Sequence, residues 1–198
     1  MLSRADRKLY RQRHRWYDRN DRWLNRRKIM REFASRRAFA RLPISGEILE
    51  GFNSGRLEVG ENTHLEPHCW LTLNLDAAQI RIGANCFLNF GVMLAAQDEI
   101  TIGDHTMIAN GCFIGDAAHR FDDPELPVPW QGFTSKGPVR IGTNVWLGAN
   151  VVVTSGVTIG DRCVIGSNSV VTTDIPPYTI AAGVPAKVIK QIEYPAAG

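Results

Sequence analysis

The chain has 198 residues, of which 44% are hydrophobic and 22% charged, and its formal net charge is +3. This length fits one domain plus an appendage. No apolar run approaches the ~18 residues of a membrane-spanning helix. Because charges are spread throughout the first 41 residues, we also expect no secretory signal peptide.

Residues 1–41 form a strongly basic segment, with 15 Lys and Arg against 4 Asp and Glu, whereas the rest of the chain carries 8 against 16. The segment lacks proline and glycine and is rich in helix formers. Leu9, Trp16, Trp23 and Met30 recur every seven positions. This spacing predicts an amphipathic helix with an aromatic stripe, which we expect over residues 5–33.

Several roles are open for this basic arm. It could pack its stripe on the acidic remainder of the chain or on a neighbouring subunit. It could lie on an anionic membrane surface, with tryptophan at the interface and arginine outward. Nothing else in the sequence resembles a nucleic-acid module, so we expect no nucleic-acid partner. An arginine-rich transit peptide is a further alternative.

From residue 59 onward, aliphatic residues recur every six positions. A helix requires a spacing near 3.6 and a half-buried strand a spacing of 2, so six indicates a short extended segment plus a turn, repeated as a β-helix. The clearest members are Ile82, Leu88, Leu94, Ile102, Ile108, Ile114, Ile141, Leu147, Val153, Ile159, Ile165 and Val171.

A second position, four residues after each aliphatic, holds small or β-branched residues. In a pleated segment it points to the same face as the next aliphatic, so each repeat contributes one large and one small inward side chain. All four cysteines, Cys69, Cys86, Cys112 and Cys163, occupy this position. We therefore interpret them as core residues, and their spacing suits neither a zinc site nor a disulfide framework.

Asparagine, aspartate and glycine follow the aliphatic residues at places where a sharp corner is needed. Three hexads make a triangular coil of 18 residues, and we count five coils between residues 59 and 176. We expect a solenoid domain over residues 42–192 and a short tail over 193–198.

The repeat is interrupted between Ile114 and Ile141 by a proline-containing segment, so we expect a protruding loop over residues 115–140. Long irregular loops on a rigid scaffold are usually functional. His119 stands at its root. Asp116, Asp122 and Asp123 lie nearby and could orient this histidine, although loop acids are more often simply solvated.

The stretch from Ile82 to Ile189 resembles the hexapeptide-repeat acyltransferases, in the branch of maltose, galactoside and nodulation-factor O-acetyltransferases. The run that carries the resemblance is IGTNVWLGANVVVTSGVTIGDRCVIGSNSVVTTDIPPYTIAAGVPAKVIKQI, residues 141–192. The resemblance implies a left-handed parallel β-helix, although the general crossover rule favours the right hand. It also implies an acetyl-CoA-dependent O-acetyltransferase acting on a saccharide or glycoconjugate, and a homotrimer with active sites between subunits.

The same resemblance implies roles for individual residues. His119 corresponds to the catalytic histidine, which removes the proton of the acceptor hydroxyl. Asn89, in the segment Asn89-Phe90-Gly91, corresponds to an acceptor-site asparagine, although a turn asparagine is a plain alternative. Gln97 stands where the family commonly has an acidic residue that binds the sugar, which puts a standard maltose-like or galactoside-like acceptor in doubt.

The acetyl-CoA site is expected on the C-terminal coils. Trp146 occupies an outward position, and the resemblance places it along the pantetheine arm, with subunit packing as the alternative. Glycine-rich corners let a backbone approach a ligand closely. The remaining residues expected near the cofactor are Gly148, Ala149, Ser167, Thr172, Thr173, Lys187 and Lys190.

Two rival functions remain open: N-acetylation of an amino sugar or amino acid, and a non-catalytic β-helix scaffold that docks through its basic arm. His64 and His68 form an H-x-x-x-H pattern, but in a coil they fall on different corners, so we expect no metal. The expected location is the cytoplasm, with peripheral contact at the inner membrane face as an alternative.

Overall fold

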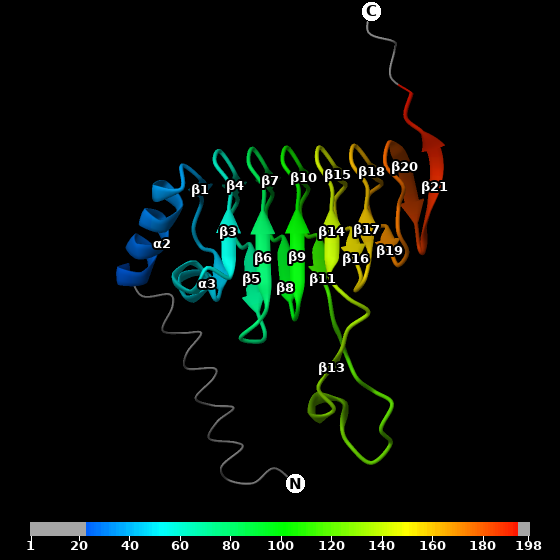
Figure 1. Ribbon diagram of the computed structural model, residues 1–198, viewed down its shortest axis with the longest axis horizontal. Coiled ribbons are helices and arrows are strands. Elements are labelled where there is room, and N and C mark those ends of the chain that lie inside the picture. Colours follow the sequence, from blue (N-terminus) through cyan, green and yellow to red (C-terminus); the bar gives the residue numbers. More distant parts are fainter. Residues whose placement is uncertain (1–22, 194–198) are drawn as a thin grey trace, which may run out of the picture.

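The computed structural model describes residues 23–193 and shows three parallel sheets that run side by side along one axis (Figure 1). Sheet C contains β3 (Leu57–Val59), β6 (Gln79–Ile82), β9 (Glu99–Ile102), β14 (Val139–Ile141) and β17 (Thr158–Ile159). Sheet A contains β1 (Phe39–Ala40), β4 (His64–Leu65), β7 (Phe87–Leu88), β10 (Met107–Ile108), β15 (Trp146–Leu147), β18 (Val164–Ile165), β20 (Thr179–Gly183) and β21 (Ala186–Gln191). Sheet B contains β2 (Ser45–Gly46), β5 (Trp70–Leu73), β8 (Met93–Ala96), β11 (Phe113–Gly115), β16 (Val152–Val153) and β19 (Val170–Val171).

The chain visits the sheets in the order C, A, B, and five complete coils run from β3 to β19. This confirms the fold class and the five coils expected from the sequence. All neighbouring strands within the coils are parallel, whereas β21 pairs antiparallel with β20 at the C-terminal end. A partial coil that the sequence analysis did not include, made of β1 and β2, precedes the first complete one. Strand β1 therefore places Phe39 and Ala40, which the sequence analysis assigned to the arm, within sheet A.

The predicted inward residues form the core. Leu88, Ile108, Leu147 and Ile165 follow one another in register across sheet A, and each is fully buried. Each strand of this register adds one large aliphatic side chain to a continuous column. Full burial of one such side chain contributes roughly 1.5–3 kcal/mol relative to leaving it exposed.

The small inward position is also confirmed, because all four cysteines are buried and none forms a disulfide. Desolvation by burial raises the pKa of the Cys69 thiol to about 12, and it raises the pKa values of Cys86 and Cys112. A thiol in this state is a poor nucleophile, so these residues fill space rather than perform chemistry.

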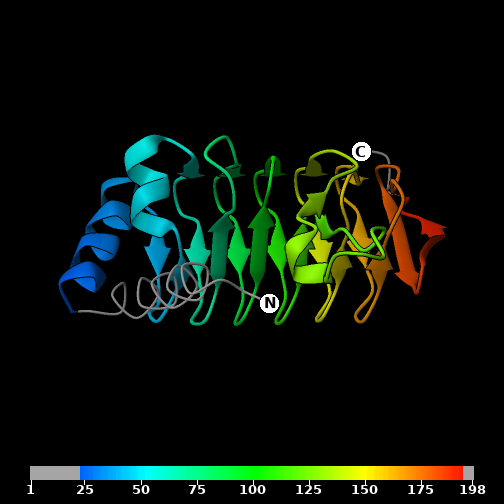
Figure 2. The same cartoon turned by 90° about the horizontal axis from the view of Figure 1, so that it is seen from below.

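The N-terminal end of the solenoid is covered by helices α2 (Trp23–Ser35) and α3 (Ile48–Ser54), which Figure 2 shows gathered at one end of the coils. Ile29 and Phe33 of α2 are buried, and the Phe33 ring meets Phe52 of α3 edge to face at a centroid distance of 5.3 Å. The guanidinium of Arg36 lies 4.2 Å from the centroid of the same Phe52 ring.

This packing corrects the expected stripe at one position. Met30 is 40% exposed, whereas its neighbour Ile29 and the following Phe33 are buried. Packing against the end of the solenoid therefore decides which residues of α2 are buried, and the seven-residue spacing does not. Residues 1–22, with Leu9 and Trp16, lie outside the described part of the chain. None of the described helices is long and apolar enough to cross a membrane.

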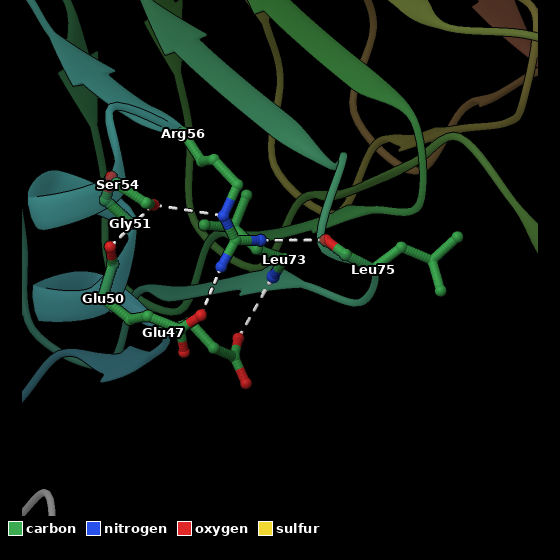
Figure 3. A network of polar contacts seen from close by, with 7 residues as sticks. All are labelled: Glu47, Glu50, Gly51, Ser54, Arg56, Leu73 and Leu75. Atoms are coloured by element: carbon green, nitrogen blue, oxygen red, sulfur yellow. Dashed lines mark hydrogen bonds and ion pairs between the residues drawn. The ribbon is translucent and has the colours of Figure 1, made fainter.

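A polar network fixes α3 to the first coil (Figure 3). Arg56 pairs with Glu50, and its guanidinium also donates to the Leu75 carbonyl oxygen at 2.8 Å. The Glu47 carboxylate accepts the Leu73 backbone N–H at 3.1 Å. These contacts satisfy backbone groups at a solenoid end where no further coil supplies partners.

The outward side chains also stack in register, and the three faces differ. Sheet C presents polar and charged residues, among which Arg81 and Arg140 both pair with Glu99. Sheets A and B present mainly apolar rows. The sheet A row is Phe39, His64, Phe87, Met107, Trp146, Val164 and Ile180. The sheet B row is Trp70, Met93, Phe113, Val152 and Val170.

The core predicts a large effect for a single inward residue. Ile108→Ala should lower the free energy of unfolding by about 2–5 kcal/mol, because it leaves a cavity between Leu88 and Leu147. Thr101→Ala, on the outer face of sheet C, is the control and should change it by no more than about 0.5 kcal/mol. Urea unfolding measures both. Equal midpoints for Ile108→Ala and the wild type would show that the column is not closely packed.

Candidate functional site

The expected loop leaves sheet B after β11 and rejoins sheet C at β14, and it projects below the coils in Figure 1. It contains one short 3-10 turn, η1 (Val128–Trp130), and a two-stranded hairpin that the sequence analysis did not predict. In this hairpin β12 (Ala118–His119) pairs antiparallel with β13 (Phe133–Thr134). The loop is thus anchored near its base while its tip extends away from the solenoid.

His119 is the end residue of β12, directly opposite Phe133. The two ring centroids are 4.5 Å apart, at an interplanar angle of 32°. The histidine side chain is nevertheless exposed. The aromatic contact limits the orientations of the imidazole and leaves it open to a reactant, which is the arrangement that a general base requires.

Asp116 is fully buried at the loop root and ties it to the preceding coil. Its two carboxylate oxygens accept the backbone N–H groups of Gln97 at 2.6 Å and Asp98 at 2.8 Å. The hydroxyl of Ser135, on the returning side of the loop, donates to the Asp116 carbonyl oxygen at 2.6 Å. Both ends of the loop therefore meet at this one residue.

These contacts correct one expectation about the acids near His119. Asp116 holds backbone N–H groups rather than the histidine. Asp122 is paired with Arg120 at 3.0 Å, and this hydrogen bond lowers the pKa of its carboxyl group. Asp123 accepts the backbone N–H of Glu125. Within the part of the chain that the structure describes, no carboxylate forms a hydrogen bond with His119, and Phe133 is its neighbour instead.

Gln97 lies at the corner between sheets B and C, next to the loop root. Its side-chain oxygen Oε1 is buried, and among residues 23–193 it has no hydrogen-bond donor. A buried carbonyl oxygen without a partner is costly to a folded protein. Because this oxygen is buried, it can meet a ligand hydroxyl only if the side chain turns outward, and Gln97 is an acceptor-binding candidate by its place beside the loop root.

Asn89 lies at the opposite end of β8 from Gln97, at the corner between sheets A and B. Its Oδ1 accepts the backbone N–H of Phe90 at 2.8 Å, which is a turn-stabilising contact. Asn89 and His119 therefore stand at opposite edges of sheet B. In a single chain the structure does not bring these two predicted residues together.

The expected cofactor residues fall into three groups. Trp146 is 50% exposed in the outer row of sheet A, and Lys187 and Lys190 lie on β21 at the end of the same sheet. Gly148, Ala149 and Ser167 lie on adjoining coils at the corner between sheets A and B. Thr172 and Thr173 follow β19 at the far edge of sheet B, away from the other six.

At the shared corner, the Ala149 backbone N–H is already bonded to the Ser167 hydroxyl, at 3.1 Å. A Cβ on Gly148 would approach the Ser167 nitrogen to 2.6 Å, so only glycine fits there. A ligand that uses the Ala149 N–H must displace the serine hydroxyl, which can then donate to the ligand itself.

The two histidines of the H-x-x-x-H pattern are used for packing. His64 stacks on Phe39 at 4.6 Å in the outer row of sheet A, and His68 lies against Phe90 at 5.0 Å. No group of three metal-ligating side chains occurs among the described residues.

Sequence comparisons place the chain among known proteins. Residues 138–173 match the model of the bacterial transferase hexapeptide (six repeats). The galactoside O-acetyltransferase of Escherichia coli K12 is 40% identical over 134 residues, which are 68% of this chain and 63% of that protein. The chain thus spans less than two thirds of that relative.

Solved structures agree with the sequence comparisons. A maltose O-acetyltransferase from Clostridium difficile 630 is 34% identical, with a TM-score of 0.56 over 88% of this chain and 78% of that one. A galactoside acetyltransferase in complex with coenzyme A is 37% identical, with a TM-score of 0.61 over 74% and 71%. These structural neighbours are left-handed β-helices, which confirms the predicted hand.

The role of Asp116 leads to a stability prediction. Asp116→Ala removes the acceptor of two backbone N–H groups and should lower the free energy of unfolding by about 1–3 kcal/mol. Asp122→Asn is the matched control, because Asp122 is exposed, and it should change stability by no more than about 0.5 kcal/mol. Thermal unfolding compares the two. If Asp116→Ala were as stable as the control, the loop root would be held by other contacts.

Proposed function

The chain belongs to the hexapeptide-repeat acyltransferase family, and from this premise we propose that it is an O-acetyltransferase. It transfers an acetyl group from acetyl-CoA to a hydroxyl of a saccharide or glycoconjugate. The observation that carries the proposal is the exposed His119, held against Phe133 at the root of the protruding loop. The names of the relatives, galactoside and maltose acetyltransferases, support a saccharide acceptor.

The chemistry requires a base because a sugar hydroxyl does not ionise near neutral pH. His119 accepts the hydroxyl proton while the oxygen attacks the thioester carbonyl of acetyl-CoA. The tetrahedral intermediate then collapses, the carbon–sulfur bond breaks, and the histidine returns the proton to the departing CoA sulfur. The products are an acetyl ester and free CoA.

Gln97 and Asn89 are the proposed acceptor contacts. The Oε1 of Gln97, which is buried and unpartnered, can accept a hydrogen bond from a sugar hydroxyl once the side chain turns outward. The Nδ2 group of Asn89 can donate one, since only its Oδ1 is engaged in the turn. The family commonly has a sugar-binding acidic residue at this position. Because position 97 holds a neutral amide here, we expect the acceptor to differ from the sugars that such a carboxylate binds.

The proposed donor site follows the C-terminal end of sheet A. The pantetheine arm lies along Trp146 and the corner formed by Gly148, Ala149 and Ser167. The charged end of CoA reaches Lys187 and Lys190, whose strand β21 is three strand spacings from β15, about 14 Å away. Thr172 and Thr173, at the far edge of sheet B, are the more distant candidates.

We propose a homotrimer because the outer rows of sheets A and B leave extended apolar surfaces. In one chain His119 projects from the corner between sheets B and C, whereas Trp146 lies on sheet A, the side of the triangle opposite that corner. A neighbouring chain can place its Trp146 face beside this His119. Each active site then lies between two subunits.

The basic arm is proposed to serve mainly as a structural cap, because α2 buries Ile29 and Phe33 on the first coils. Arg27 and Arg31 remain exposed on the same helix. Peripheral contact of a cytoplasmic enzyme with an anionic membrane is the additional proposal for this surface. Sedimentation with anionic vesicles that fades as salt increases supports this contact, and no sedimentation at low salt refutes it.

The catalytic proposal is tested with His119→Ala and a panel of saccharide acceptors. The variant should lose about 10²–10⁴-fold in kcat and keep its affinity for acetyl-CoA, because the lost interaction is with the proton in transfer. Arg37→Asn, at an exposed corner of the partial coil, should keep wild-type turnover. Mass spectrometry detects the product, and cleavage by hydroxylamine distinguishes an ester from an amide.

Wild-type turnover in His119→Ala would mean that another group is the base. A hydroxylamine-resistant product would instead assign the enzyme to N-acetylation. Absence of transfer to any hydroxyl or amine acceptor, with acetyl-CoA bound, would favour the scaffold role.

A further inference from the structure

The corner between sheets C and A carries one residue per coil in the left-handed backbone conformation, with φ between 54° and 61°. Each occupies the same place, two residues before the outward residue of the sheet A strand, so the side chains form a column along the axis. Its members are Arg37, Asn62, Asn85, His105, Asn144, Arg162 and Tyr178. Successive members are separated by about one strand spacing of 4.8 Å.

Asparagine tolerates this conformation well, whereas it is unfavourable for most other side chains. Three of the seven positions are asparagine, but the C-terminal part of the column holds His105, Arg162 and Tyr178. Arg162 and Tyr178 keep a costly conformation at a place where the repeat itself uses asparagine, whereas histidine is among the residues that adopt it more readily. Such departures from the favourable residue cluster at functional sites.

The same three side chains line a cavity of about 400 Å³, within the size range of small-ligand sites. The remaining lining residues are Thr143, Asn144 and Asp161. Asp161 also borders a second depression of about 420 Å³ on the outer face of sheet C. That depression includes Arg140 of β14, the strand at which the loop rejoins sheet C. The two depressions meet at Asp161 and together extend from the column onto the outer face of sheet C.

The lining of the first cavity suits a neutral polar ligand. Arg162 and Asp161 carry opposite charges, so the cavity favours neither an anion nor a cation. Amide, hydroxyl, carboxylate and guanidinium groups together offer both donors and acceptors. The Tyr178 side chain is 41% exposed and adds an aromatic surface with a polar tip. A saccharide, with many hydroxyl groups and an apolar C–H face, matches this combination.

We propose that the cavity at His105, Asn144, Arg162 and Tyr178 is a saccharide-binding subsite separate from the acetyl-transfer site. It holds a sugar unit of a glycan whose other end extends across sheet C toward the loop. Binding at this subsite requires neither acetyl-CoA nor His119, so it can be tested whether or not the proposed transfer reaction is correct.

The experiment applies the fluorescently labelled full-length protein, without acetyl-CoA, to a glycan array. The wild type should bind a defined set of glycans, and His119→Ala should bind the same set. Arg162→Asn and Tyr178→Asn should each reduce binding about tenfold or more. Asparagine is the residue that the repeat uses at this corner, so both variants should fold, and circular dichroism and thermal unfolding verify this.

Arg37→Asn is the matched control, because Arg37 has the same conformation in the same column but lies outside the cavity. It should bind as the wild type does. The proposal is overturned if the wild type binds no glycan or if the folded Arg162→Asn and Tyr178→Asn variants bind as well as the wild type. It is also overturned if Arg37→Asn loses binding to the same extent, since that result would indicate a general charge effect.

Discussion

Every coil of this protein must return to the same position one strand spacing further along the axis, and the rest of the structure depends on that constraint. Stacked backbones satisfy one another's N–H and C=O groups, so a coil with a misplaced corner would leave polar groups unpaired. The constraint fixes an inward aliphatic residue, a small inward residue and a left-handed corner in each repeat. Leu147, Val145 and Asn144 supply these three in one coil.

The same register also aligns the outward side chains into rows, and these rows determine which surfaces of the solenoid are charged and which are apolar. On sheet C the aligned residues are charged and pair with one another, as Arg81 and Arg140 do with Glu99. On sheets A and B they form apolar rows, which include Trp146 and Phe113. A soluble monomer rarely exposes continuous apolar surface of this extent. The rows therefore favour association between chains, which is the basis of the proposed site between two subunits.

The sequence predicted the features that repeat. The hexad spacing identified the coils, the buried cysteines and the outward Trp146, because each follows from a local pattern that recurs. It did not predict the partial coil at β1 and β2 or the burial of Ile29 rather than Met30. The partial coil and the burial of Ile29 depend on the shape of the solenoid end, which no repeating sequence pattern describes.

The site was predictable to a smaller extent. The break in the repeat located the loop and His119, but the contacts that hold them are long-range. The Asp116 carboxylate meets the N–H groups of Gln97 and Asp98 nearly twenty residues earlier, and Phe133 meets His119 through a hairpin. Neither contact could be predicted from the spacing of the residues in the sequence. The histidine, arginine and tyrosine at left-handed corners were also missed, since only asparagine and glycine signal that conformation.

The most direct test of a site shared between subunits is complementation between His119→Ala and Trp146→Ala, measured at subsaturating acetyl-CoA. Each variant alone should be nearly inactive. Co-expressed in equal amounts, they form mixed trimers in which one intact His119 faces one intact Trp146, so about a quarter of wild-type activity should return. Activity equal to the average of the two separate variants would contradict the account and place the whole site within a single chain.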